Sequence, residues 1–159
     1  MVSFLLLGDY NSWHIEKGWN GFLPLATTKA QIERVLKVSN PETVSENEIR
    51  YASDVALVHA TYSTPGCTVT DGSGNESPLP TDTVLRYDVV PRKTLTTSEI
   101  KWNPSEFLRE IDIHVLGFVH YRNLRLGISI ETRETEKGTE QIRNVRYFLS
   151  DDQKKKVKC

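Results

Sequence analysis

Apolar residues recur at every second position over much of this chain, which is the period of a β-strand with one buried face. The clearest case lies in the middle of the chain, where Leu85, Tyr87 and Val89 alternate with Arg86 and Asp88. Similar alternation is present closer to the C-terminus, over residues 126–131 and 141–149. The chain therefore has to bury one face of a sheet against another layer.

Helical spacing is clear in one segment, residues 28–39, which is predicted as the main helix. Thr28 and Gln31 have the spacing of a capping box, and apolar residues then follow on one helical face. A proline after the segment prevents the helix from continuing. A second, short helix is predicted at residues 104–110, because a proline stands at its first position.

Short turns separate the predicted strands, so neighbouring strands pair antiparallel, and two helices are too few for repeated crossovers. The predicted class is α+β, with an antiparallel sheet and both helices packed on one of its faces. Residues 114–121 are mostly apolar on both faces and are predicted as a central strand. Residues 63–80 are rich in glycine and proline and are predicted as a mobile loop.

The length of 159 residues suits a single domain, which is predicted over residues 19–159. Residues 1–18 are predicted as an N-terminal segment, either a first strand or the remainder of an export signal. Their apolar run, residues 2–7, has no preceding Lys or Arg and is shorter than the apolar core of a full signal peptide. No run approaches the roughly 20 apolar residues that cross a bilayer, so we expect no membrane span.

The charges of the chain are balanced, with 20 basic and 21 acidic residues and a formal net charge of −1. Proteins that bind nucleic acids mainly through phosphate contacts carry a basic excess, so we expect no nucleic-acid partner. The sequence also contains no glycine-rich phosphate loop and no dinucleotide-binding fingerprint. No cofactor is therefore predicted.

The four histidines are the main candidates for catalysis or metal binding. His114 and His120 share one face of the predicted central strand, but about 20 Å separates them there, which is too far for one metal ion. We therefore predict no metal site. One hypothesis, a small hydrolase or ligand-binding enzyme, uses His59 from another strand together with His114 or His120. No serine or cysteine has the flanking pattern of an activated nucleophile, so no catalytic residue is predicted.

The favoured hypothesis is a non-enzymatic module that binds a protein or peptide partner through a sheet face or through the 63–80 loop. One main helix covers the sheet only in part and would leave a groove. The candidate binding surface comprises Leu116, Phe118 and His120 from the predicted central strand, together with Trp19. Trp19 has a second interpretation, in which it closes the end of the core. The partner and the oligomeric state stay open.

The two cysteines, Cys67 and Cys159, have two interpretations. A disulfide between them would tie the last residue of the chain to the 63–80 loop. Alternatively, both are free thiols of a cytoplasmic protein. The residues alone do not decide between these interpretations.

Four groups of residues occur in the same order along the chain as in a known family. They are residues 19–36 with the pattern Trp-x-Gly-x-x-Pro-Leu before a helix, Tyr62-Ser63 before Cys67, residues 80–91 between two prolines, and Gly127-Ile128 with Tyr147-Phe148 before a final Val157-Lys158-Cys159. Together they cover residues 19–159 and resemble an uncharacterised family of small exported bacterial proteins.

The resemblance implies that Cys67 and Cys159 match the two recurrent cysteines of the family and form a disulfide. It also implies a periplasmic or secreted location, because relatives usually begin with an export signal. A cytoplasmic location stays open, since no full signal peptide is present. The family helix usually ends in Leu-Gly, whereas Lys37 follows Leu36 here, which predicts that this helix continues to residue 39. No activity is known for the family, so the resemblance implies none.

Overall fold

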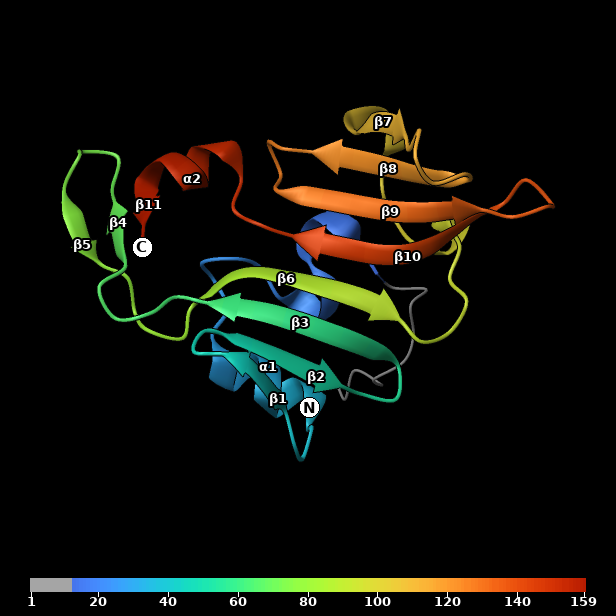
Figure 1. Ribbon diagram of the computed structural model, residues 1–159. Coiled ribbons are helices and arrows are strands. Elements are labelled where there is room, and N and C mark those ends of the chain that lie inside the picture. The colour runs from blue at the N-terminus through green and yellow to red at the C-terminus, as the bar shows by residue number, and fades with distance from the viewer. Residues whose placement is uncertain (1–12) are drawn as a thin grey trace, which may run out of the picture.

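The computed structural model describes residues 13–159, and within that range the chain forms two antiparallel sheets (Figure 1). The larger sheet has eight strands in the order β1-β2-β3-β6-β10-β9-β8-β7, and all neighbours are antiparallel. The predicted class, α+β with an antiparallel sheet, is confirmed. In sheet order the strands are β1 (Glu42–Ser45), β2 (Glu48–Ala52), β3 (Ala56–Tyr62), β6 (Val84–Pro91), β10 (Glu140–Tyr147), β9 (Ile128–Glu134), β8 (Phe118–Asn123) and β7 (Leu108–Ile111).

The hydrophobic core begins ahead of residue 19. Trp13 and Ile15 are buried with the sheet residues, and the backbone of this segment exchanges hydrogen bonds with Lys101. Residues 1–12 of the predicted N-terminal segment lie outside the described residues. The short 3-10 turns of the first hundred residues are η2 (Ile15–Lys17), η3 (Trp19–Gly21) and η4 (Thr97–Glu99).

The main helix α1 (Lys29–Leu36) begins at the predicted capping box. The Thr28 hydroxyl accepts the Gln31 N–H, and the Gln31 side chain accepts the Thr28 N–H at 2.8 Å. The helix ends at Leu36 because Lys37 adopts a left-handed conformation with φ of 49°. The predicted continuation to residue 39 is therefore wrong. Ile32 and Leu36 belong to the core, and α1 lies behind β1 and β2 in Figure 1.

The second predicted helix, residues 104–110, is wrong beyond its first turn. Asn103 caps a 3-10 turn, η5 (Pro104–Glu106), by accepting the Ser105 N–H. From Leu108 onwards the chain pairs with β8 instead, as strand β7. The proline and its cap thus predict the first turn correctly. The helix does not continue, because pairing with β8 gives more backbone N–H and C=O groups a hydrogen bond than one further turn would.

The predicted central strand, residues 114–121, is also wrong in its first half. Residues 112–117 form a turn, in which the Asp112 carboxylate accepts the N–H groups of His114 and Val115 at 2.8 and 3.1 Å. These hydrogen bonds hold the pKa of Asp112 below its usual value. Gly117, at φ of 82°, closes the turn, and β8 starts only at the next residue.

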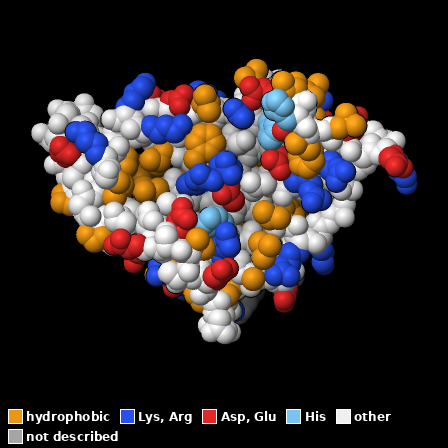
Figure 2. All heavy atoms as spheres, viewed as in Figure 1, with side chains coloured by type: hydrophobic (Ala, Val, Ile, Leu, Met, Phe, Trp, Pro, Cys, Tyr) orange, Lys and Arg blue, Asp and Glu red, His pale blue; other side chains and the backbone are white. Residues whose placement is uncertain are grey.

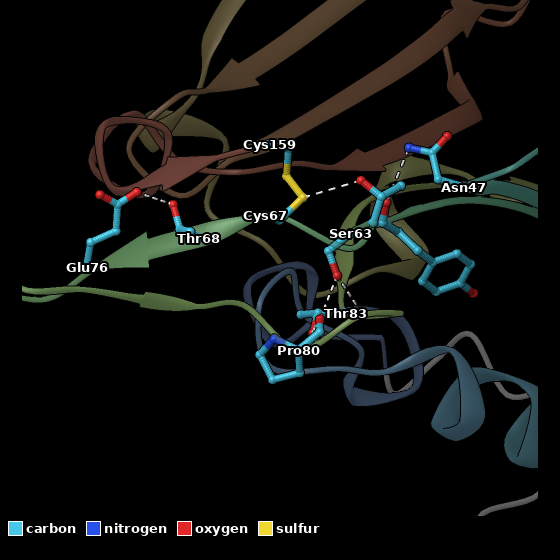
Figure 3. Close-up of a disulfide and its surroundings, with 10 residues drawn as sticks. Asn47, Ser63, Cys67, Thr68, Glu76, Pro80, Thr83 and Cys159 are labelled. Carbon is cyan, nitrogen blue, oxygen red and sulfur yellow. Dashed lines mark hydrogen bonds between the residues drawn. A yellow bond between two sulfur atoms is a disulfide. The ribbon is translucent and has the colours of Figure 1, made fainter.

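The 63–80 segment contains a hairpin, β4 (Thr68–Thr70) and β5 (Glu76–Pro78), where a loop is predicted. The C-terminal residues form α2 (Asp151–Lys156) and β11 (Val157–Lys158), and β11 pairs with β4 in the second sheet. Where the 63–80 segment leaves the large sheet, the Ser63 hydroxyl donates to the carbonyl of Pro80 and accepts the Thr83 N–H (Figure 3). Because α2 lies beside this small sheet, the helices do not share one face of the large one.

A disulfide joins Cys67 to Cys159, beside the pairing of β4 with β11 (Figure 3). Cys67 is buried, whereas Cys159 is exposed. The pairing implied by the family resemblance is confirmed, and it fixes the last residue of the chain to the hairpin.

The large sheet consists of two four-stranded halves that meet between β6 and β10. This seam has three register pairs, Val89 with Val145, Asp88 with Arg146, and Tyr87 with Tyr147. On the core side the rings of Tyr87 and Tyr147 stack, with centroids 4.7 Å apart. The Tyr87 hydroxyl donates to the Phe22 carbonyl and accepts the Trp19 N–H, so the seam also anchors the N-terminal turns.

Removing the disulfide with Cys159→Ser is expected to lower the free energy of unfolding by about 4–5 kcal/mol, because a bond across 92 residues restricts the unfolded chain. Urea unfolding monitored by circular dichroism measures the change. Wild-type protein kept reduced is the matched control and should unfold at the same urea concentration as the variant. Equal stability of the variant and the oxidised wild type would contradict the prediction.

Alkaline pH is expected to destabilise the fold through its buried tyrosines. Burial raises the pKa of Tyr51 to about 12, which a hydrogen bond from Tyr62 partly offsets. A folded-state pKa above the unfolded value of about 10 gives stability that is complete below pH 10 and is lost as pH rises further. Tyr51→Phe should therefore reduce the slope of unfolding free energy against pH between about 10 and 12, measured by urea titration, and an unchanged slope is the contrary result.

Candidate functional site

One face of the large sheet faces the viewer in Figures 1 and 2, away from α1 and the N-terminal turns. Side chains alternate between the two faces of a strand, so those that are not in the core gather on this open face. On β3, for example, Val58 and Ala60 are buried in the core, while Leu57 and His59 lie on the open face. The open face therefore carries the side chains that alternate with the core residues, and it includes both polar residues and a few aliphatic ones.

Three arginines from different strands line a hollow of about 430 Å³ on the open face. They are Arg86 on β6, Arg122 on β8 and Arg146 on β10. We call this the arginine hollow. Its other lining residues are His120, Leu124, Ser129, Glu131, Asn144 and Phe148. In the described part of the chain, Arg86 and Arg146 share a single carboxylate partner, Asp88, so the hollow keeps guanidinium donors for an anionic group.

A second hollow, of about 550 Å³, lies on the other side of the seam and is mainly apolar. Leu57 and Val90, which are opposite each other in the register of β3 and β6, expose 44% and 39% of their surface there. We call this the apolar hollow. Its polar lining includes His59, Arg50 and Glu42. Asn144 lines both hollows, so they adjoin each other.

Asp88 stands between the two hollows and holds two of the arginines in place. Its carboxylate accepts hydrogen bonds from the Arg86 and Arg146 guanidinium groups, and Asn144 Nδ2 lies 3.4 Å from one of its oxygens. The side chain of Asp88 is only 11% exposed, so its charge is largely removed from water and depends on these partners. Each guanidinium has five donors, so these hydrogen bonds to Asp88 leave further N–H groups on both arginines.

Two polar atoms beside Asp88 are buried and make no hydrogen bond among the described residues, namely His59 Nε2 and Asn144 Oδ1. Both residues line the apolar hollow. A carboxylate oxygen of Glu48 lies 3.7 Å from His59 Nε2. Buried polar atoms without a partner are energetically costly, and these two lie in residues that border the apolar hollow.

The residues predicted as a binding surface are not all brought together. Phe118 and His120 lie on the open face of β8, and His120 lines the arginine hollow beside Asp112 at 3.5 Å and Glu131 at 3.8 Å. Leu116 lies in the 112–117 turn and is 96% exposed. Trp19 is 5% exposed and packs edge-on against Phe22 in the core, in accordance with its second interpretation.

The histidines of the enzyme hypothesis are far apart. His59 is on β3 and His120 is on β8, so four inter-strand spacings of about 4.8 Å place them about 19 Å apart. His114 lies in the exposed 112–117 turn, between β7 and β8. Among residues 13–159, no three His, Cys, Asp or Glu side chains are grouped so that they could hold a metal ion.

Comparison of the chain with family models, with curated proteins and with solved structures finds no match. The resemblance to exported bacterial proteins therefore stays a prediction. Within the described residues, no helix is both long enough and apolar enough to cross a bilayer.

The arginines and Asp88 are site residues that the sequence alone did not single out. Arg86 and Asp88 are visible there as the polar members of an alternating strand. Their connection to Arg146, 58 residues away, depends on the pairing of β6 with β10. No local signal in the sequence reveals which strands will be neighbours.

Neutralising the carboxylate between the arginines with Asp88→Asn is expected to lower the free energy of unfolding by about 1–3 kcal/mol, since it leaves Arg86 and Arg146 without a counter-charge. Chemical denaturation measures the change. Glu136→Gln, in the exposed 135–139 turn, is the matched control and should change stability by less than about 0.5 kcal/mol. An equally small change in the free energy of unfolding for Asp88→Asn and Glu136→Gln would contradict the prediction.

Proposed function

We propose that this protein is a non-enzymatic module that binds a protein or peptide partner on the open face of its large sheet. The observation that carries the proposal is the pair of adjoining hollows on that face, one lined by Arg86, Arg122 and Arg146 and the other by Leu57 and Val90. Binding sites combine apolar contact area with a few polar groups that fix orientation. The two hollows supply both components side by side.

The chemistry of the hollows specifies the kind of segment that fits them. A carboxylate of the partner would pair with the arginine hollow, where planar guanidinium groups offer two parallel donors. A neighbouring aliphatic side chain would enter the apolar hollow and cover Leu57 and Val90. The proposed ligand is therefore a segment that carries acidic residues next to aliphatic ones.

The proposed location is the bacterial envelope or the medium outside the cell. The disulfide between Cys67 and Cys159 supports it, because such bonds persist in oxidising compartments and are rare in the cytoplasm. The resemblance to exported proteins supports the same location. The partner would then be another protein outside the cytoplasm.

The arginine hollow is tested with a short peptide of glutamates followed by leucines, titrated by calorimetry. Arg122→Gln is expected to weaken binding about tenfold, because one charge-assisted hydrogen bond is lost. Arg122 suits this test since its one described ion pair, with Glu110, is exposed on both sides. Lys137→Gln, in the distant 135–139 turn, removes an equal charge and should leave the affinity unchanged.

A peptide with lysines in place of the glutamates should bind much more weakly than the acidic one. Equal binding of both peptides, or an equal effect of Arg122→Gln and Lys137→Gln, would show that the open face does not recognise acidic segments.

A further inference from the structure

The edge strand β7 and the turn after it form the most exposed apolar surface of the described chain. Among its large hydrophobic side chains nine are exposed, and five of these lie in residues 108–116. We call this segment the β7 edge. Ile113 and Leu116 are 87% and 96% exposed. The five residues are Leu108, Ile111, Ile113, Val115 and Leu116.

The backbone of β7 is free to pair on its outer side. The Asp112 N–H donates to the Phe118 carbonyl on β8, and backbone groups alternate in direction along an antiparallel strand. Leu108 and Glu110 therefore direct their backbone groups towards β8, and Arg109 and Ile111 direct theirs away from it. Among residues 13–159 β7 is the last strand of the sheet, so no other described strand pairs with these outward groups.

The opposite edge of the sheet lacks these properties. Strand β1 is interrupted by a register shift between Thr43 and Ser45, and Glu42 and Glu46 flank its one exposed aliphatic residue, Val44. Bulges and charges of this kind prevent edge strands from pairing with other chains. β7 pairs with β8 in unbroken register and has no such interruption.

Charges at the β7 edge specify what can pair with it. Arg109 is occupied on the core side, where it lies over the Tyr121 ring and 3.5 Å from Glu140. On the open side Glu110 pairs with Arg122 at 3.2 Å, and Asp112 and Glu131 both lie near His120. The Glu110 side chain stays 42% exposed beside Arg122, so its carboxylate can accept a further hydrogen bond. A basic residue opposite Glu110 would be complementary.

A second copy of the chain is a poor match for this edge. In one continuous sheet, two antiparallel copies of β7 would have equivalent side chains on the same face. The two-fold axis that relates the copies would then pass between two equivalent residues, either Arg109, Glu110 or Ile111. The first register places Arg109 opposite its copy, and the second places Glu110 opposite its copy. The third places Glu110 of one copy opposite Asp112 of the other. Like charges directly opposite are destabilising. Each register therefore opposes self-pairing.

We propose that the β7 edge binds an extended segment of another protein, which adds a ninth strand to the large sheet. The segment carries aliphatic residues and one basic residue opposite Glu110. Its backbone pairs with Arg109 and Ile111, and its aliphatic side chains cover Ile111 and Ile113. This mode of recognition combines main-chain hydrogen bonds for affinity with side-chain contacts for specificity. The β7 edge adjoins the arginine hollow at Arg122, but residues 108–116 line neither hollow, so this proposal does not depend on the function proposed for them.

The test uses the whole protein and a blocked peptide with the alternating sequence Val-Thr-Val-Lys-Val, titrated while backbone amides are followed by NMR. The lysine is placed opposite Glu110. We expect shifts and slower hydrogen exchange at the amides of Arg109 and Ile111. A second peptide, with glutamate in place of the lysine, should bind several-fold more weakly because of Glu110.

Ile111→Pro removes one outward N–H without breaking a hydrogen bond to β8, which is the position where an edge strand tolerates proline. It should weaken binding about tenfold or more. Ile111→Thr keeps this N–H and is the matched control, with a smaller loss. Unchanged amide exchange in β8 and β9 shows that both variants are folded.

Three results would overturn the proposal. The first is equal peptide binding by Ile111→Pro and Ile111→Thr. The second is that the peptide shifts the NMR signals of open-face residues while the signals and the hydrogen exchange of the Arg109 and Ile111 amides stay unchanged. The third is a dimer whose β7 amides are already protected before the peptide is added.

Discussion

The fold depends on the seam between β6 and β10, which is the one place where the two halves of the large sheet meet. It has three register pairs, whereas β3–β6 and β9–β10 on either side have seven each. The short seam is reinforced on both faces. Stacked Tyr87 and Tyr147 hold its core side, and the Asp88–Arg146 ion pair holds its open side. Both tyrosine hydroxyls also bond the N-terminal segment, so that segment closes over the seam.

The same seam determines where the two hollows of the open face lie. Both hollows border it and share Asn144, and the buried carboxylate of Asp88 separates the arginines from the aliphatic residues. An ion pair that holds the sheet together thus also orients the groups proposed to bind a partner. The disulfide-linked small sheet lies to one side in Figure 1 and leaves this face uncovered. Stability of the seam and recognition by the face therefore involve the same residues.

Local patterns in the sequence predicted local structure well. The capping box at Thr28 placed the start of α1, and alternation placed the core residues Tyr87 and Val89 on one side of a strand. Local patterns fail where apolar residues are exposed, as in the 112–117 turn, because a run of aliphatic residues predicts a buried strand. The site was missed because it arises from the neighbour relation of β6 and β10, which long-range pairing determines.

Native-state hydrogen exchange in increasing denaturant tests most directly whether the seam makes the two halves of the sheet one cooperative unit. We expect the amides of β3 and of β9, which lie on opposite sides of the seam, to open with the same free energy and the same dependence on denaturant. Opening of β9 at a clearly lower free energy, with β3 still protected, would contradict it. The halves would then be independent, and the Tyr87–Tyr147 and Asp88–Arg146 contacts would not couple them.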